Sequence, residues 1–473
     1  MEKISPQQQL GNAKLGRLML KFSVPCVLSL LISALYNIVD QIFIGNSELS
    51  ALGNAATGVV FPVFIVAQAF AWCLGDGCAA FINIFQGKGE TQKLDRSVGG
   101  CITVTLGCSV ALIALFFPLK NQILNLCGAS QNSIGYAVTY FNIVVAFFPV
   151  YMLSNMLNSV VRADGNPAWA MASMLAGALI NIALDPLFIF AFKMGMAGAA
   201  WATVIGQAAS FIIGAAYLFR TRTFKLKLSS FIPSFKAVVP AVKLGISTFI
   251  TQSTIVVIAL LSNFMLKKYG AQSVYGEDIP IAIIAIENKV FAIVVSVAVG
   301  IILGCQPIVS YNLGCGNYAR VKRLFLYILA CIGVIGAVAT VLFQVCPSAI
   351  IGLFGAPSDG QNINPQLYTQ FGVKTFRIFL MLIGFTCFIK FASIFFQAVG
   401  KPVIATVASL IRDIVCFVPL ACVLPLSMGI DGVLWAAPVA DAVAVVVTVA
   451  LIIICFKSLN AMERKEKAQR NVE

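Results

Sequence analysis

The sequence predicts an all-α integral membrane protein with twelve transmembrane helices in two six-helix lobes, related by a pseudo-twofold axis along the membrane normal. Three observations lead to this prediction: an apolar composition, twelve long apolar segments and an internal repeat. Hydrophobic residues make up 60% and charged residues 11% of the chain, whereas a soluble domain is about half apolar and about a quarter charged. A lipid bilayer is therefore the expected solvent.

Each apolar segment is long enough to cross a bilayer, which takes about 20 residues of helix. The first six fall near residues 20–44, 55–82, 98–118, 134–160, 168–192 and 196–219. After a basic stretch, the other six fall near 238–266, 280–306, 324–346, 368–397, 402–425 and 431–456. The chain is therefore expected to form an N-terminal lobe with its linker, residues 1–230, and a C-terminal lobe with a charged tail, residues 231–473.

Basic residues are distributed unevenly between the loops. With the N-terminus placed inside, the inner segments hold 22 Lys and Arg residues, and the outer loops hold only Lys120, Lys193, Lys267 and Lys268. Because positive charge collects on the cytoplasmic side, both termini are expected in the cytoplasm of a multi-pass plasma-membrane protein. The same alternation accounts for the net charge of +14 without a nucleic-acid partner. The expected partners are small organic substrates and the lipid bilayer, and the chain is expected to be a monomer.

Four short motifs recur in the same order in the two halves. Gly87-Lys88-Gly89 recurs as Gly314-Cys315-Gly316, Leu126-Cys127-Gly128-Ala129 as Leu353-Phe354-Gly355-Ala356, Gly165-Asn166-Pro167 as Gly400-Lys401-Pro402, and Met194-Gly195 with Gly198 and Trp201 as Met428-Gly429 with Gly432 and Trp435. An even number of spans in each half makes this repeat parallel. Parallel repeats place a substrate site at their interface and favour alternating access.

Side chains that carry out enzyme catalysis are sparse. The chain has no histidine, and its 14 cysteines are scattered through apolar segments without a CxxC motif. No pairing of a nucleophile with a base is evident either. We therefore expect neither an enzyme nor a bound cofactor, and we expect the cysteines to pack as small apolar side chains.

Ionisable groups inside a membrane span are costly and therefore indicate function. Asp40 falls near the outer end of the first segment and Asp185 about two turns from the outer end of the fifth, and neither these acids nor Asp76 has an evident basic partner. Asn181 shares a helix face with Asp185, four residues later. Thr203 lies about two turns below the outer end of the sixth segment. These depths predict one polar cluster of Asp40, Asn181, Asp185 and Thr203.

Two kinds of coupling ion suit this cluster. Two carboxylates in a low-dielectric pocket cannot both ionise cheaply, so the Asp40 and Asp185 pair could hold and release a proton. The oxygens of Asp40, Asn181, Asp185 and Thr203 equally suit Na⁺, a hard cation. The alternative is that these polar groups only cap or cross-link helices.

The second half carries a different set of charges in or near its spans. They are Lys243, Glu287, Lys289, Lys374, Arg377, Lys390, Arg412, Asp413 and Asp441. We expect most of them to form structural salt bridges, with Glu287 either pairing with a cation such as Lys390 or contacting substrate. Asp76, which lies between two glycines, is equally consistent with function and with helix packing. The candidates for lining a substrate cavity are Asp76, Glu287 and Asn37.

Several motifs resemble those of the multidrug and toxin extrusion (MATE) transporters. They are Pro25 with Leu35-Tyr36-Asn37-Ile38-Val39-Asp40, then Arg162-Ala163-Asp164-Gly165-Asn166-Pro167, Leu184-Asp185-Pro186 and Ala202-Thr203. Gln306-Pro307-Ile308 with Tyr311-Asn312-Leu313-Gly314 resembles the MepA-like branch in particular. The resemblance covers nearly the whole chain.

This resemblance implies a V-shaped pair of lobes and export of organic, cationic or amphiphilic compounds in exchange for H⁺ or Na⁺ by alternating access. In several members, side chains of helices 1, 4, 5 and 6 form the coupling cluster. They look to fall here on Asp40, Asn155, Asn181, Asp185 and Thr203. Acids that other members carry in helices 7 and 10 are not matched, so coupling is expected in the first lobe. The alternative is a flippase for lipid-linked precursors from the same superfamily, which would need a strongly cationic central cavity.

Overall fold

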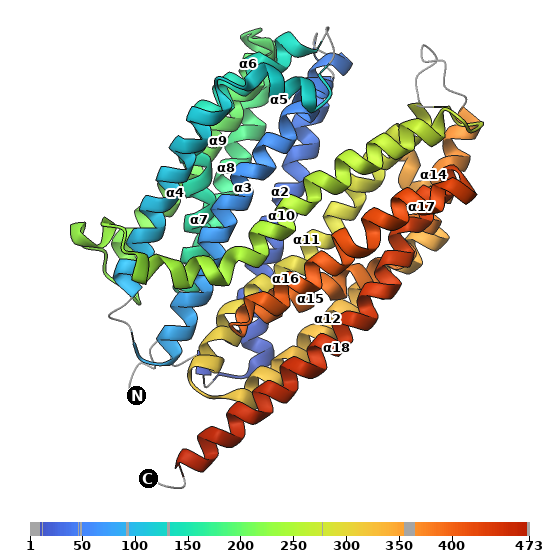
Figure 1. Cartoon of the computed structure of the whole chain (residues 1–473). Helices are drawn as coiled ribbons and strands as arrows, with labels where there is room; N and C mark the ends of the chain where they lie inside the picture. The colour runs from blue at the N-terminus through green and yellow to red at the C-terminus, as the bar shows by residue number, and fades with distance from the viewer. Residues whose placement is uncertain are drawn as a thin grey trace. The chain divides into compact units, whose positions relative to one another are not determined.

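The computed structural model describes residues 10–11, 13–45, 47, 50–90, 94–129, 133–276, 278–353 and 365–470, which form helices joined by turns and contain no strand (Figure 1). Within these residues, ten helices are long and apolar enough to cross a membrane. Two further spans are pairs of shorter helices with a bend between them, which brings the total to twelve. The predicted all-α membrane fold is therefore confirmed.

The first half contains six spans and three further short helices, α5, η3 and η4. Its elements are α2 (Leu15–Gly45), α3 (Ser50–Gly87), α4 (Leu94–Phe116), α5 (Lys120–Leu126), α6 (Ile134–Ala146), α7 (Phe148–Ala163), α8 (Pro167–Pro186), η2 (Leu187–Ala191), α9 (Gly195–Tyr217), η3 (Leu218–Arg220) and η4 (Leu228–Phe231). Each span covers one of the first six apolar segments, in the predicted order.

The second half repeats this plan. Its elements are α10 (Phe235–Gly270), α11 (Asp278–Gly314), α12 (Tyr318–Val345), α13 (Pro347–Gly352), α14 (Pro365–Phe379), α15 (Ile383–Ala398), α16 (Pro402–Leu410), η5 (Ile411–Phe417), α17 (Val418–Met428) and α18 (Ile430–Arg470). The second copy of one recurring motif falls partly on residues 354–356, which lie outside the described residues.

Two irregularities occur at equivalent places in the two halves. The fourth span is the pair α6 and α7, bent by 58°, and the tenth is the pair α14 and α15, bent by 46°. Pro149, the second residue of α7, has no N–H with which to continue α6. The fifth and eleventh spans each contain a π-helical turn, η2 and η5. These matching breaks are what an internal repeat predicts.

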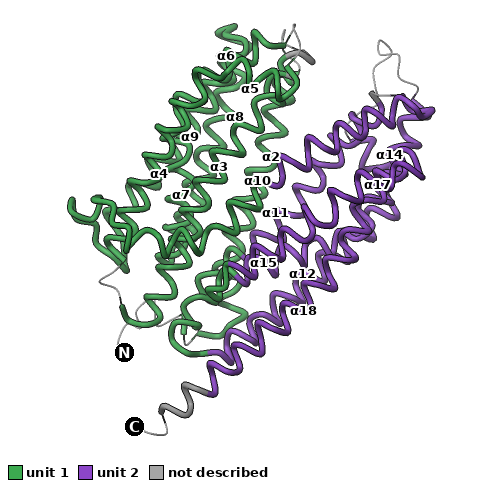
Figure 2. Tube along the Cα trace, viewed as in Figure 1, with its two compact units in different colours: residues 1–253, 303–317, 397–402 green, residues 254–302, 318–396, 403–473 purple. Residues whose placement is uncertain are grey.

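Two compact units make up the chain, coloured green and purple in Figure 2. Unit 1 comprises Met1–Ser253, Leu303–Asn317 and Gln397–Pro402, and unit 2 comprises Thr254–Ile302, Tyr318–Phe396 and Val403–Glu473. Unit 1 therefore contains the beginning of α10 and the end of α11 as well as α2 to α9. Helices α10 and α11 each contribute to both units.

Close backbone packing explains why the beginning of α10 belongs to unit 1. A Cβ atom at Gly245 of α10 would overlap the carbonyl oxygen of Cys73 in α3, and one at Gly77 would overlap the carbonyl oxygen of Ala241. Small residues let helix backbones approach this closely within a membrane. The glycines thus join α3 directly to α10.

Replacing Gly245 by Ala is expected to destabilise the protein by about 1–3 kcal/mol, because the new methyl group forces the α3 and α10 backbones apart. The measurement is thermal unfolding of the purified protein in detergent. Gly107→Ala in α4 is the matched control, since a Cβ there meets nothing within 4 Å. Helix-interior Gly→Ala changes without a clash are neutral or stabilising, so equal loss in both variants would contradict the proposed contact.

Asp164 fixes the linker between the halves to unit 1. Its carboxylate accepts hydrogen bonds from the Tyr217 hydroxyl at 2.8 Å and from the backbone N–H groups of Arg222 and Thr223 at 2.8 and 3.0 Å. Gly165 follows with φ of +86°, a conformation that favours glycine, and Asn166 caps α8 through its side chain. These contacts explain the Asp-Gly-Asn-Pro motif by local structure alone.

Candidate functional site

The carboxyl groups of Asp40 and Asp185 meet inside unit 1. Asp40 lies in the last turns of α2, and Asp185 lies at the end of α8, just before Pro186. Asp40 is 9% exposed and Asp185 is fully buried. The two side chains are within hydrogen-bonding contact of each other. The equal depth inferred from the sequence thus corresponds to a direct contact in the structure.

Asn181 joins this pair from one turn earlier in α8. Its Nδ2 donates to Asp185 Oδ1 at 3.4 Å, and it is 3% exposed. One oxygen of each side chain, Asp40 Oδ1, Asn181 Oδ1 and Asp185 Oδ2, is buried without a hydrogen-bond partner among the described residues. The site therefore presents three unpartnered oxygens, two from carboxyl groups and one from an amide.

The contact between the two carboxyls limits their charge. An ionised carboxylate only accepts hydrogen bonds, so a hydrogen bond between Asp40 and Asp185 requires a proton on one of them. No Lys or Arg among the described residues forms an ion pair with either acid. The charge of this buried pair can therefore be balanced by a proton or by a bound cation.

Thr203 forms hydrogen bonds with groups other than the carboxyl pair. Its hydroxyl donates to the Ala199 carbonyl at 3.0 Å and contacts the hydroxyl of Tyr140 from α6. Tyr140 and Tyr36 both lie close enough to Asp40 to interact with its charge. Sequence reasoning missed both tyrosines. Tyr36 could have been found, because it precedes Asp40 by one helical turn, whereas Tyr140 is brought in only by the fold.

Asn155 and Asn37 form hydrogen bonds with groups other than the carboxyl pair. Asn155 accepts a hydrogen bond from Trp72 Nε1 at 3.2 Å and donates to the Tyr151 carbonyl at 2.9 Å, so both ends of its amide are occupied. The exposed Asn37 donates to the Ser33 carbonyl of its own helix at 2.7 Å. Among the described residues, neither forms a hydrogen bond with Asp40 or Asp185.

Asp76 has a basic partner, so the expectation that it lacks one is wrong. Arg162 lies 3.5 Å from Asp76 Oδ1, and Ser159 Oγ donates to the same oxygen at 2.7 Å. Arg162 belongs to the last turn of α7 rather than to a loop, which lets it reach back along the helix. Gly75 packs against the backbone of Met156, so the glycine beside Asp76 allows close contact of α3 and α7.

In unit 2, the expected pairing of Glu287 with Lys390 is also wrong. Lys390 lies 3.5 Å from Asp413, and Arg412 lies 2.9 Å from Asp413 and 2.8 Å from Asp441. Arg412 and Asp413 therefore bind each other in addition to residues of other helices. Glu287 is 1% exposed, and both its carboxyl oxygens lack a hydrogen-bond partner among the described residues.

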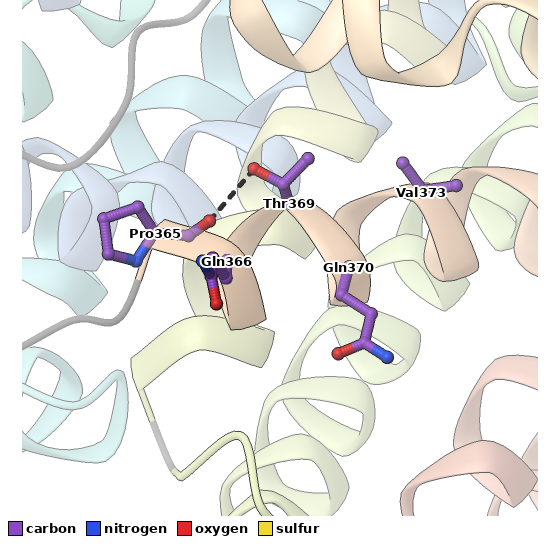
Figure 3. A pocket seen from close by; sticks show the side chains of 5 residues that line it. All are labelled: Pro365, Gln366, Thr369, Gln370 and Val373. Carbon is purple, nitrogen blue, oxygen red and sulfur yellow. Dashed lines mark hydrogen bonds between the residues drawn. The ribbon is translucent and has the colours of Figure 1, made fainter.

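A hollow in the surface of α14 lies on its first turns. Its lining is Pro365, Gln366, Thr369, Gln370 and Val373, and the Thr369 hydroxyl donates to the Pro365 carbonyl at 3.0 Å (Figure 3). This lining contains no charged side chain and none of the sequence-predicted site residues. We therefore assign it no part in coupling.

Comparisons with known proteins agree with this architecture. The family model MatE matches residues 25–187 and 247–423. The chain is 27% identical over 441 residues to multidrug export protein MepA of Staphylococcus haemolyticus, covering 91% of this chain and 92% of that protein. It is 26% identical over 430 residues to MepA of Staphylococcus aureus strain MRSA252, covering 89% and 90%.

Solved structures show the same fold. An outward-facing structure of a multidrug resistance MATE family transporter of the MOP superfamily aligns with a TM-score of 0.86 at 20% identity, covering 96% of this chain and 98% of that one. A MOP superfamily transporter from Pyrococcus furiosus aligns with a TM-score of 0.87 at 21% identity, also covering 96% and 98%. Since the family model covers well over half of the sequence, the chain belongs to the MatE family of membrane transporters.

Proposed function

We propose that the protein exports organic, cationic or amphiphilic compounds across the plasma membrane in exchange for protons, and that Asp40 and Asp185 form its coupling site. The contact between these buried carboxyls, without a Lys or Arg partner among the described residues, carries the proposal. The names of the curated relatives, multidrug export proteins, supply the substrate class. We place both termini in the cytoplasm and expect a monomer.

Exchange requires the pair to bind a proton differently in two conformations. A ligand shifts an equilibrium only by its difference in affinity for the two states. Protonation removes the repulsion between Asp40 and Asp185 and lets α2 and α8 stay in contact, whereas loss of that proton favours their separation. A substrate that favours the separated state then lowers proton affinity by the same factor, because coupling is reciprocal.

Sodium is the second candidate for the coupling ion. The unpartnered oxygens of Asp40, Asn181 and Asp185 are hard ligands of the kind that Na⁺ prefers. Thr203 supports a sodium site less, because its hydroxyl already contacts Ala199 and Tyr140. The contact between the carboxyls favours the proton.

Three cations of unit 2, Lys374, Lys390 and Arg412, give the flippase alternative no support. Lys390 and Arg412 are paired with Asp413 and Asp441, and Lys374 lies 2.6 Å from Asp431. These cations are therefore neutralised by the protein itself. A site for an anionic pyrophosphate would leave cations available to the ligand.

The test is efflux of a fluorescent organic cation from cells that express the protein, while the pH gradient and the sodium gradient are collapsed in turn. We expect efflux to stop when the pH gradient is removed and to persist without the sodium gradient. Loss of efflux with the sodium gradient alone would replace the proton by Na⁺. Efflux that survives removal of both gradients would contradict antiport, and vector-only cells give the background.

A further inference from the structure

Glu287 is a buried carboxyl that the proposed coupling site does not use. It lies in the part of α11 that belongs to unit 2, beside the buried side chains of Ile283, Ile284 and Ile286. Its exposed fraction is 1%, and neither carboxyl oxygen has a hydrogen-bond partner among the described residues. A polar group buried in this way is costly unless its charge is removed or compensated.

The cation that interacts with Glu287 is already compensated. Arg412 of η5 is the cation that interacts with Glu287 through its charge, but its Nε bonds Asp441 and its guanidinium NH1 bonds Asp413. Lys390 of α15 also pairs with Asp413. Two cations and two anions make this network neutral, so an ionised Glu287 would add an uncompensated negative charge.

Two threonines also bind the aspartates of this network. Thr254 of α10 donates to Asp413 Oδ2 at 3.1 Å, and Thr386 of α15 donates to Asp441 Oδ2 at 2.6 Å. Arg412 and Asp413 sit in the π-helical turn η5, a feature often found at functional sites. The equivalent span of unit 1 has its π-helical turn directly after Asp185 and Pro186.

We propose that Glu287 is a second proton-exchanging carboxyl, located in unit 2, with Arg412 as the counter-charge that stabilises its ionised form. In the state described, the carboxyl keeps its proton and the network stays neutral. When its O–H bond breaks, the proton passes to water and the carboxylate bonds Arg412, which uses two of its five N–H donors for Asp441 and Asp413. This inference rests on the proposed proton-coupled export and adds a second proton to each cycle.

In the part of the chain that the structure describes, no Lys or Arg forms an ion pair with Glu287. Lys289 is two residues further along α11 and therefore faces another side of the helix. Asp413 and Asp441 would repel a second negative charge rather than stabilise it. Proton exchange at Glu287 is therefore governed by Arg412 and by access of water to α11.

The test counts protons in proteoliposomes that contain the full chain. A pH-sensitive dye measures proton movement while an electrode selective for tetraphenylphosphonium measures transport of that cation. We expect about two protons per cation for the unchanged protein and about one for Glu287→Gln, whose neutral amide mimics the protonated acid. Glu287→Asp keeps a carboxyl and should keep the higher ratio, and Glu463→Gln, a change at the Lys322 ion pair, is the control.

Infrared spectroscopy gives a readout that does not depend on transport. The spectrum of the unchanged protein should contain a band of a protonated carboxylic acid that is absent from the spectrum of Glu287→Gln. This band should disappear when the medium is made alkaline. If Glu287→Gln moves as many protons per cation as the unchanged protein, or if the unchanged protein has no such band, the proposal of a second proton site is overturned. If the unchanged protein moves no protons at all, the proposed function fails instead, and the infrared band still decides whether Glu287 holds a proton.

Discussion

Asp185→Asn is expected to stop proton exchange at the carboxyl pair and to reduce proton-driven export of organic cations strongly, and Asp40→Asn is expected to do the same. An amide keeps the shape of the protonated acid but cannot release a proton, so the carboxyl pair no longer contributes a difference in proton affinity between the two conformations. Coupling free energies between sites are typically about 1–3 kcal/mol, or about 5–150-fold in affinity. We expect the rate of efflux driven by the pH gradient to fall by an amount near the upper end of this range, about 150-fold, or by more.

The measurement is efflux of a fluorescent cation from cells that express each variant at equal level. Asp185→Glu is the matched control, since it keeps the titratable carboxyl and should keep a dependence on the pH gradient. The buried position of Asp185 makes folding a concern, so thermal unfolding of each purified variant is measured in parallel. Full efflux by both Asn variants at normal expression would exclude the carboxyl pair as the coupling site.

Arg412→Met is expected to cost about 3–5 kcal/mol of stability, because removing one partner of a buried ion pair leaves the other charge uncompensated. Asp441 would lose its 2.8 Å ion pair, and Asp413 would lose its 2.9 Å ion pair with Arg412 and keep the one with Lys390 at 3.5 Å. For domains of about 150–250 residues, each kcal/mol shifts the Tm by about 2–4 °C. We therefore expect the Tm of Arg412→Met to fall by roughly 6 °C or more.

A double variant separates loss of charge balance from loss of packing. Arg412→Met combined with Asp441→Asn removes one cation and one anion, so the network is neutral again. Its Tm should lie above that of Arg412→Met alone. If the two variants unfold at the same temperature, the loss comes from packing of the arginine stem and the buried charge is not the cause.

The sequence was sufficient to predict the spans because their signal is local. Each of the twelve apolar segments became one span, including the two bent pairs, since a helix in lipid satisfies its backbone hydrogen bonds within the segment. The depth of Asp40, Asn181 and Asp185 followed in the same way from the fixed rise per residue. These inferences needed no knowledge of which helices are neighbours.

The sequence could not predict the ion-pair partners of the charged residues, because these partners depend on contacts between helices and not on a local signal. Arg162 looked like a loop residue, and Lys390 looked like a partner for Glu287. Instead Arg162 pairs with Asp76 and Lys390 with Asp413. A long side chain can reach any of several acids at similar depth, and only helix packing selects one.

The sequence by itself thus determined the solvent, the number and order of the spans, the repeat and the acids buried in the first half. Tertiary structure alone decided that Asp40 and Asp185 touch and that Tyr140 lies close enough to Asp40 to interact with its charge. It also decided that Glu287 has no hydrogen-bond partner among the described residues. The spans follow from hydrophobic periodicity along one segment. The contacts depend on how closely two helices approach each other. Small residues such as Gly77 and Gly245 determine that distance, but only when both helices are packed together.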